Sequence, residues 1–386
     1  MPPIYFGWEE SAVLAKEKLL QRSSLFVKEV GDVSSRAQQG LPIAEAVPRL
    51  VDFVQVGPND GAHRVSIRLA VSALMPVLAL AAAGRLEWSP YALLASTVAV
   101  YGRRRPPRTR LRVQAEVAAA QVLVIVGGAA LALARPAPWL LVVCTAFVAA
   151  ATAALADIRR WNPPGALFFL FGFAVCASLP GTDLADVAVA LALSTASVVT
   201  VLLVTALDAP LKHASDTDTP IPGPLPGRII AAQAVACLGA GLAAGLAAAA
   251  LGIDRPYWAM VSAIIPIIGS TTSAQLSRAG HRFVGTLAGV IPAALLFQIH
   301  MSQLVLLLLV VALMGCTEAF VTRNYAGALV FLTPMTIAMA LTTPGVPLST
   351  LLVDRCLETA VGLMAAVVAI IATHRIRHPR TADATG

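Results

Sequence analysis

Long apolar runs separated by short polar connections fill the sequence from about residue 66 to residue 373. Most runs are long enough to cross about 30 Å of hydrocarbon at about 1.5 Å of rise per helical residue. The pattern therefore predicts an all-α integral membrane protein with about twelve transmembrane helices. We place the segments at 66–84, 88–102, 114–134, 138–156, 165–180, 184–207, 228–251, 257–273, 283–300, 302–320, 324–342 and 349–373.

Composition agrees with a membrane location. The 386 residues are 58% hydrophobic and only 13% charged, whereas soluble domains are about 45–50% apolar and about 25% charged. The formal net charge of +7 comes from arginines that punctuate apolar runs, so we do not expect a nucleic-acid partner. All five cysteines lie singly inside apolar runs, and we expect neither disulfides, nor a metal, nor a cofactor.

Polar stretches divide the chain into five parts. We predict a cytoplasmic N-terminal region at 1–62 with a surface helix near 11–30, and a six-helix membrane repeat at 63–207. A cytoplasmic linker at 208–227 separates it from a second six-helix repeat at 228–374, and a cytoplasmic tail at 375–386 follows. With the N-terminus inside, sixteen cations fall in the inner connections and tail against three outside. This bias predicts a plasma-membrane protein with both termini cytoplasmic.

Internal similarity favours one unit written twice. Trp88, Arg108 and Arg112 recur 170 residues later as Trp258, Arg278 and Arg282. A later block repeats at an offset of 162 and aligns Asn162 with Asn324. Six spans in each half predict that the two repeats are parallel rather than inverted.

Several short motifs in the second half carry a family resemblance. They are Tyr257-Trp258, Arg278 with His281-Arg282, Gly285-Thr286 with Gly289, Arg323-Asn324-Tyr325 before Thr333-Pro334, and Arg355 with Glu358-Thr359 and Gly362. With Val100-Tyr101-Gly102-Arg103 in the first half, they resemble the FUSC (fusaric acid resistance) family over about residues 64–375. The resemblance implies the aromatic acid exporter superfamily, whose plant malate transporters are similar to one six-span half and work as dimers. It implies a fused pseudo-dimer with a pathway between the halves.

The chain departs from the larger exporters of that family in one respect. Those proteins carry a sizeable soluble domain between the membrane halves, whereas the linker from Asp208 to Gly227 is twenty residues long. Docking to a periplasmic adaptor is therefore in doubt, and the resemblance fixes no substrate.

The third segment of each half begins with an arginine, and these two arginines are candidates for anion binding. Arginine holds a carboxylate in a planar, bidentate manner, so Arg112 and Arg282 are predicted to form a symmetric pair at the inner mouth. The alternative is that they anchor the chain to lipid phosphates. The second segment of each half is short and contains Pro90 or Pro266, a feature typical of transporter binding sites.

Ionisable residues inside the last segment are costly in lipid and therefore informative. Asp354, Arg355 and Glu358 share one helix face by their spacing. We expect either an interior salt bridge that locks helix packing, or a site where substrate competes for Arg355 while Asp354 or Glu358 carries a proton. The positions expected to match in the first half, Ala192, Leu193 and Ala196, are apolar or small.

The remaining polar candidates have weaker signals. Thr286, Asn324, Tyr325 and Thr333 are predicted to line the pathway, with helix packing as the alternative. Other residues have expected roles at the membrane boundary: Trp88, Tyr257 and Trp258 as an aromatic belt, Arg103 to Arg105 as anchors, and Glu116 and Glu318 as interfacial residues or partners of nearby arginines.

These observations predict a secondary transporter that exports organic anions, aromatic ones among them, with proton coupling left open. The sequence contains neither a phosphate-binding loop nor a catalytic triad, so we expect no enzyme activity. The predicted partners are the lipid bilayer and a small organic anion, and self-association stays open. The alternative function is a non-transporting membrane scaffold of the cell envelope.

Overall fold

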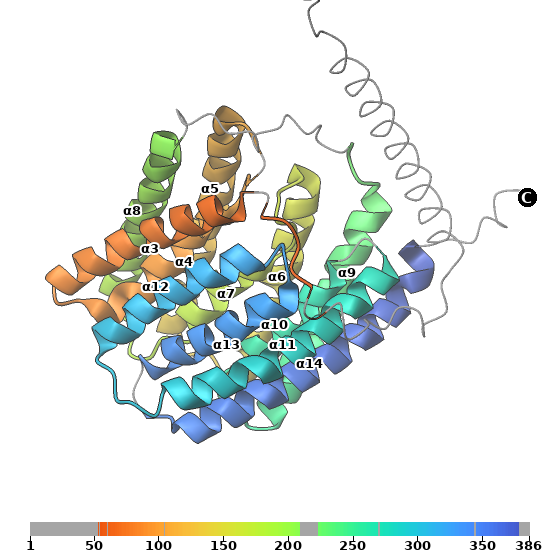
Figure 1. The fold of residues 1–386 in the computed structure, drawn as a ribbon. Coiled ribbons are helices and arrows are strands. Elements are labelled where there is room, and N and C mark those ends of the chain that lie inside the picture. The colour runs from red at the N-terminus through yellow and green to blue at the C-terminus, as the bar shows by residue number, and fades with distance from the viewer. Residues whose placement is uncertain are drawn as a thin grey trace, which may run out of the picture. The chain divides into compact units, whose positions relative to one another are not determined.

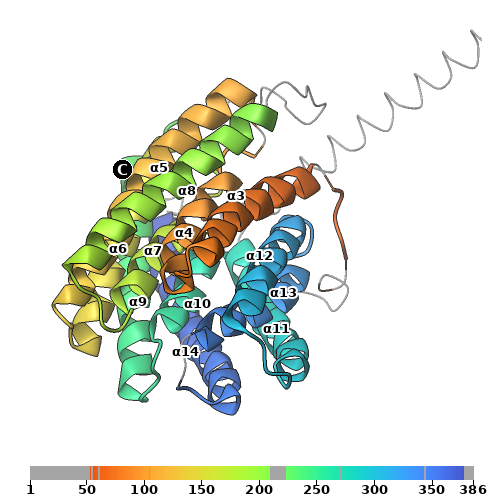
Figure 2. The same cartoon turned by 90° about the vertical axis from the view of Figure 1, so that its left-hand side faces the viewer.

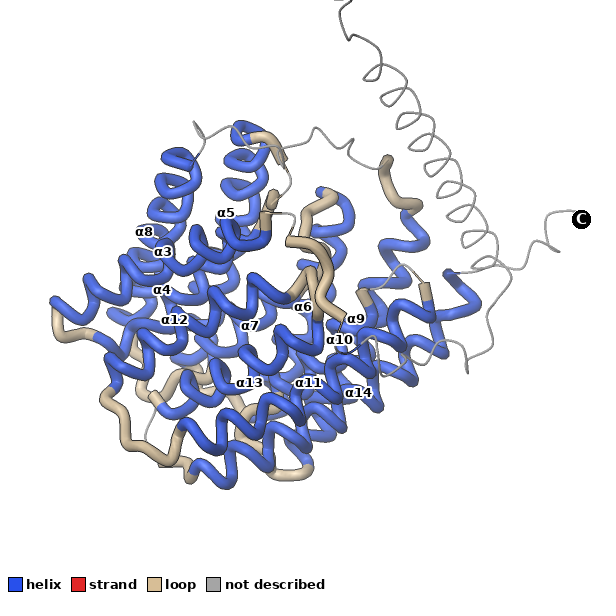
Figure 3. The backbone as a smooth tube through the Cα atoms, viewed as in Figure 1, coloured by secondary structure: helices blue, strands red, loops and turns tan. Residues whose placement is uncertain are grey.

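A computed structural model describes residues 53, 55–59, 61–103, 105–208, 223–268, 271–342 and 345–377. The predicted surface helix at 11–30, most of the linker and most of the tail lie outside the described residues. Within the described ranges every regular element is helical (Figure 3). Among the described residues, none of the five cysteines forms a disulfide bond.

Twelve α-helices occur in the described part of the chain, and each overlaps one of the predicted apolar segments. We call residues 62–208 the first half and residues 227–377 the second half. The helices of the first half are α3 (Ala62–Ala82), α4 (Ser89–Ser96), α5 (Pro107–Leu133), α6 (Pro138–Arg159), α7 (Leu167–Ala177) and α8 (Leu184–Asp208). Those of the second half are α9 (Gly227–Ala250), α10 (Tyr257–Ile267), α11 (Thr272–Leu296), α12 (Gln303–Phe320), α13 (Tyr325–Leu341) and α14 (Leu348–Arg377).

Eight of these helices are long and apolar enough to cross a bilayer, which makes the chain a multi-pass membrane protein. The other four, α4, α7, α10 and α13, are shorter, and α4 continues into a 3-10 helix, η3 (Thr97–Val100). The count of twelve spans therefore stays a prediction. The four short helices are the second and fifth of each half, so the short helices occur at the same places in both halves.

The helix α11 begins well before its predicted apolar run. α11 starts at Thr272 rather than near residue 283, because the hydroxyl of Thr271 accepts a hydrogen bond from the backbone N of Ala274 at 3.2 Å and caps the helix. The connection that the predicted segments leave at 274–282 is therefore helical. Arg282 lies about 15 Å along α11 at about 1.5 Å per residue, well inside the helix rather than at its end.

Helix contacts in one half recur in the other. In the first half α5 packs on α7 and α8, and α4 packs on α8; in the second half α11 packs on α13 and α14, and α10 packs on α14. Between the halves, α6 lies against α9 and α3 lies against α12 (Figures 1 and 2). Each half thus contacts the other through its first and fourth helices.

Small residues allow the closest of these contacts, as is usual between membrane helices. A Cβ on Gly245 would lie 2.5 Å from Cγ1 of Val142, where α9 meets α6. A Cβ on Gly362 would lie 2.3 Å from the carbonyl oxygen of Ala259, where α14 meets α10. These positions fix how closely the short helix α10 sits between its neighbours.

Candidate functional site

A cavity of about 710 Å³ lies between the two halves. All four short helices contribute to its wall, α4 and α7 from the first half and α10 and α13 from the second, together with α11, α12 and the connections beside them. Apolar side chains line its middle, among them Leu93, Phe171, Val261, Leu329 and Met335. The four helices that are shorter than the candidate membrane spans are therefore all part of the cavity wall.

Charged side chains gather at the two ends of the cavity. Where α11 begins and α12 ends, the wall contains Arg103, Arg278, His281 and Glu318, and we call this the Arg103 end. Where α10 begins, the wall contains Asp254 and Arg255. The cavity thus connects two polar ends through an apolar middle.

Aromatic rings form part of the wall near the start of α10. Tyr257 and Trp258 are buried, and the Trp258 ring packs edge-on against Phe171 from α7 with 4.4 Å between centroids. Both residues were expected in a lipid-facing belt, and that expectation is wrong. The reason is that α10 is surrounded by other helices, so each of its eleven residues is buried.

Arg282 lies directly behind the cavity wall. Its side chain is 0% exposed, and its Nη1 donates a hydrogen bond to the hydroxyl of Tyr325 at 3.0 Å. Its Nε and Nη2 have no hydrogen-bond partner among the residues that the structure describes. Tyr325 itself lines the cavity, and a phenol that accepts a hydrogen bond keeps its own proton free to donate. Tyr325 therefore connects a buried guanidinium to the cavity.

Arg355 is a second buried cation near the first. Its guanidinium lies over the ring of Trp258, with Cζ 4.3 Å from the centroid, and its Nη1 is 3.7 Å from a carboxylate oxygen of Glu358. Within the described part of the chain, none of its three guanidinium nitrogens has a partner within hydrogen-bond distance, and the like charge of Arg282 repels it. The interior salt bridge predicted for the last segment is therefore present. Because Arg282 and Arg355 have one carboxylate, that of Glu358, between them, this group carries a net positive charge.

Arg355 also borders a small second cavity of about 20 Å³, enough for about one water molecule. Asp354 and Glu358 line it too, and its wall shares Arg255 and Trp258 with the large cavity. The three charged residues predicted on one face of the last segment thus meet at this small cavity.

The structure does not bring Arg112 together with Arg282. The Arg112 side chain is 79% exposed and pairs with Glu116, whose carboxylate also binds Arg159. The buried faces of α5 and α11 match at an offset of 161, which aligns Gln114 with Gln275, Ala118 with Ala279, Gln121 with Arg282 and Gly128 with Gly289. The counterpart of Arg282 is therefore Gln121, whose amide donates to the carbonyl oxygens of Leu94 and Phe168.

The last helices of the two halves also match at an offset of 161. Their buried positions align Ala190, Ser194, Ser197, Val198 and Val201 with Leu351, Arg355, Glu358, Thr359 and Gly362. The counterparts of Arg355 and Glu358 are thus two buried serines, not Leu193 and Ala196. At these aligned positions the second half carries charge and the first half does not.

The other predicted pathway residues have different surroundings. Asn324 caps α13 by accepting from the backbone N of Gly327, and its amide donates to the carbonyl oxygens of Phe53 and Gln55. Thr286 and Thr333 are buried on α11 and α13, and in the described part of the chain their hydroxyls have no hydrogen-bond partner. Of the sequence-predicted site residues in the described part of the chain, Tyr325 is the one in the wall of the large cavity.

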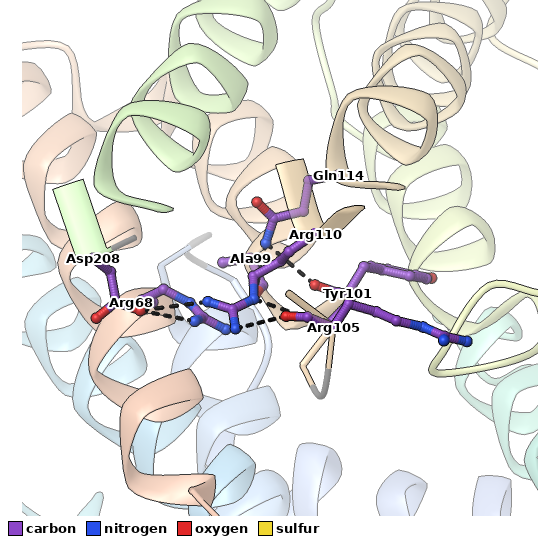
Figure 4. A network of polar contacts seen from close by, with 8 residues as sticks. Arg68, Ala99, Tyr101, Arg105, Arg110, Gln114 and Asp208 are labelled. Atoms are coloured by element: carbon purple, nitrogen blue, oxygen red, sulfur yellow. Dashed lines mark hydrogen bonds and ion pairs between the residues drawn. The ribbon is translucent and has the colours of Figure 1, made fainter. Parts of the chain in front are cut away.

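Two groups of ion pairs were not predicted from the sequence. Arg68 and Arg110 both bind Asp208, at 3.1 and 3.5 Å, and Arg110 also donates to the carbonyl oxygen of Arg105 (Figure 4). Arg68 lies inside a predicted span, a signal that could have identified it, but Asp208 was assigned to the linker. Arg103 was predicted to be a lipid anchor; instead it lines the cavity and pairs with Glu318.

Comparisons with known proteins agree with the resemblance. Residues 242–369 match the family model described as fusaric acid resistance protein-like. The chain is 36% identical over 86 residues to an uncharacterized membrane protein, YvaC, of Bacillus subtilis (strain 168), an alignment that covers 22% of this chain and 14% of that relative. No solved structure matches. The segment that is similar to the fusaric acid resistance protein-like family thus contains Arg282, Tyr325 and Arg355.

Proposed function

We propose that this protein is a secondary transporter that exports organic anions, aromatic ones among them, through the cavity between its halves. The observation that carries the proposal is the composition of the cavity wall, because short helices from both halves meet there. Transporters with internal repeats place their sites where such short or broken helices come together.

The helix contacts support two parallel six-helix repeats. Three contacts within the first half, α5 with α7, α4 with α8 and α5 with α8, each recur in the second half between the helices that lie six places later. If each helix is replaced by the one at the same place in the other half, the contact of α6 with α9 becomes that of α12 with α3, which is also present. An exchange of this kind is what an approximate two-fold axis between the halves produces. The cavity would then lie at that axis.

The chemistry of the cavity suits an anion with an apolar body. Its middle offers apolar and aromatic surface for a ring, including Phe171 and Trp258. Its ends offer arginines, and the Tyr325 hydroxyl offers a proton donor backed by Arg282. A hydrogen bond accepted from a guanidinium polarises the phenol and strengthens its donation to a carboxylate.

The direction and coupling of transport are part of the proposal. The excess of cations in the connections at the Arg103 end supports a cytoplasmic location for that end. Glu358 neutralises part of the charge of Arg355. When a substrate carboxylate competes for Arg355, the released Glu358 is a candidate to take up a proton, with Asp354 as the second candidate.

The scaffold alternative is less well supported. A scaffold needs no open space between its halves, whereas here a large cavity lies between them. Truncation separates the two functions, provided that it stops at residue 50, because Phe53, Gln55 and Gly57 bind the turn between α12 and α13. Loss of residues 1–50 should spare anion flux and would disable a scaffold anchored through its N-terminus.

The transport proposal is tested by reconstitution in liposomes. Flux of a panel of aromatic and aliphatic carboxylates is followed with and without an imposed pH gradient, for the natural protein, Arg282→Ala and Arg355→Ala. Flux that falls in either variant supports the function and identifies the residue, and flux that follows the pH gradient supports proton coupling. The absence of flux across the panel would contradict the proposal.

A further inference from the structure

Arg103 and Glu318 join the two halves at one end of the cavity. Arg103 follows η3 in the first half, Glu318 lies in the last turn of α12 in the second, and Nη2 of Arg103 binds Oε1 of Glu318. Nη1 of Arg103 also lies 3.4 Å from the hydroxyl of Thr322. Both charged side chains are largely buried, at 11% and 7% exposure, and both line the cavity.

We propose that this ion pair is a latch, and that the carboxylate of the transported anion releases it by taking the place of Glu318 on Arg103. The inference rests on the proposed function for the identity of the competing anion. It adds a specific step, in which occupancy of the cavity at the Arg103 end breaks a bond between the two halves.

The position of the pair within the cavity wall supports this exchange. Arg103 is a lining residue of the cavity, so an entering carboxylate comes close to a guanidinium that can bind it in the same way as it binds Glu318. The positive charge of Arg68 on α3 also acts on Glu318. A second cation therefore remains in its surroundings when Arg103 changes partner. Because Arg68 also binds Asp208, it compensates the charge of Glu318 only in part during the exchange.

The mechanical consequence follows from where the partners sit. Arg103 belongs to the connection between η3 and α5, whereas Glu318 belongs to α12, which packs on α3 of the other half and on α13. Loss of the pair removes a link between these elements beside the cavity. The protein then has two states, one with the pair of Arg103 and Glu318 formed and one with it broken. A ligand shifts the balance between two states only if it binds one of them more tightly. The anion binds the broken state more tightly, because Arg103 is available to it in that state.

The latch is tested first without any transport, by a double-mutant cycle on the melting temperature of the purified full-length protein in detergent. The variants are Arg103→Gln, Glu318→Gln and their combination. We expect each single change to lower the melting temperature and the double change to lower it no further than the worse single change. The matched control is the exposed pair of Arg159 with Glu116 inside the first half, for which small effects are expected.

The exchange is tested next with benzoate as the probe, by its half-saturation concentration in liposomes. Glu318→Gln removes the competing carboxylate and keeps its shape, so the half-saturation concentration should fall about tenfold, the value of one charged hydrogen bond. Arg103→Gln should raise it. The charge-reversed double variant, Arg103→Glu with Glu318→Arg, should recover melting temperature but not benzoate affinity.

The outcomes separate this inference from the proposed function. Additive melting-temperature changes in the cycle would overturn the latch whether or not the protein transports benzoate. A coupled cycle with an unchanged half-saturation concentration in Glu318→Gln would overturn the exchange with the substrate. If Glu318→Gln does not fold, Glu318→Asp, which keeps the charge on a shorter side chain, should show the same changes in smaller measure.

Discussion

The hydroxyl of Tyr325 accepts a hydrogen bond from Nη1 of Arg282 at 3.0 Å and so joins the cavity wall to a cation with no exposed surface. A charge buried in a membrane protein is expensive and usually marks a functional pathway. This cation has no acidic partner among the ion pairs of the described residues. The tyrosine is therefore the direct route by which its charge reaches the cavity.

Tyr325→Phe should weaken anion binding while the protein still folds. The change removes the acceptor of Arg282 and the donor that faces the cavity, so we expect the half-saturation concentration for benzoate to rise about tenfold. Stability should fall by about 1–3 kcal/mol, because a buried guanidinium loses its hydrogen bond. Flux in liposomes and melting in detergent measure the two effects, and unchanged flux would exclude Tyr325 from the site.

Arg282→Gln should abolish the anion preference with little loss of stability. The counterpart position in the first half holds Gln121, which is buried at the same place on its helix, so the fold accommodates this side chain. Removing an uncompensated buried charge also lowers the desolvation cost. Arg112→Gln, at an exposed surface, is the matched control and should behave like the natural protein. A large drop in melting temperature in Arg282→Gln would show a structural role instead.

Gly362→Ala should disrupt the contact between α14 and α10. The added Cβ would lie 2.3 Å from the carbonyl oxygen of Ala259 and 2.6 Å from Cβ of Ser262, so the helices must separate. Overpacking of this kind costs about 1–3 kcal/mol or more. Gly239→Ala on α9 meets no atom within 4 Å and should instead stabilise by about 0.5–1 kcal/mol. Thermal unfolding of the two variants should shift in opposite directions.

Asp208→Asn should destabilise the first half. Its carboxylate binds both Arg68 and Arg110, and the arginines are almost fully buried whereas Asp208 is 19% exposed. Removing one member of a buried ionic group costs about 3–5 kcal/mol, and partial exposure of Asp208 places the expected loss at the lower end. Glu116→Gln, within an exposed ion pair, is the control. Equal melting temperatures for the two variants would contradict this account of the network.

The sequence predicted the all-helical class and the positions of the long helices well, because apolar runs long enough for a membrane are hard to mistake. It misjudged the start of α11, because the polar first turns of that helix precede its apolar run and look like a connection. Thr271 and the buried Gln275 show that these turns are helical. Arg282 was consequently predicted at a helix end rather than deep in the bundle.

The relation between the halves was harder to predict from the sequence. Tryptophan and arginine identities gave an offset of 170, whereas the buried faces of α5 and α11 match at 161. Arginines near a helix end occupy any exposed position equally well, so Arg112 and Arg278 carry little information on register. Buried small and amide residues, such as Gly128 and Gln114, are fixed by helix contacts and carry more.

Ionic partners that are distant in sequence were also beyond reach. Arg103 pairs with Glu318, 215 residues away, and Arg68 pairs with Asp208, 140 residues away. Hydropathy assigns each of these residues to a segment end without saying which ends meet. Their pairing depends on the packing of α3 against α12 and α8, which the pattern of one chain does not specify.

The central claim is that anions pass through the cavity between the halves, and obstructing that cavity tests it most directly. Leu332 lines the cavity from α13, whereas Leu295 on α11 is 71% exposed and lies outside its wall. Carboxylate flux in liposomes is measured for Leu332→Trp and Leu295→Trp after both are shown to melt like the natural protein. We predict that flux is lost in Leu332→Trp and kept in Leu295→Trp. Flux at the natural rate in Leu332→Trp would contradict the account.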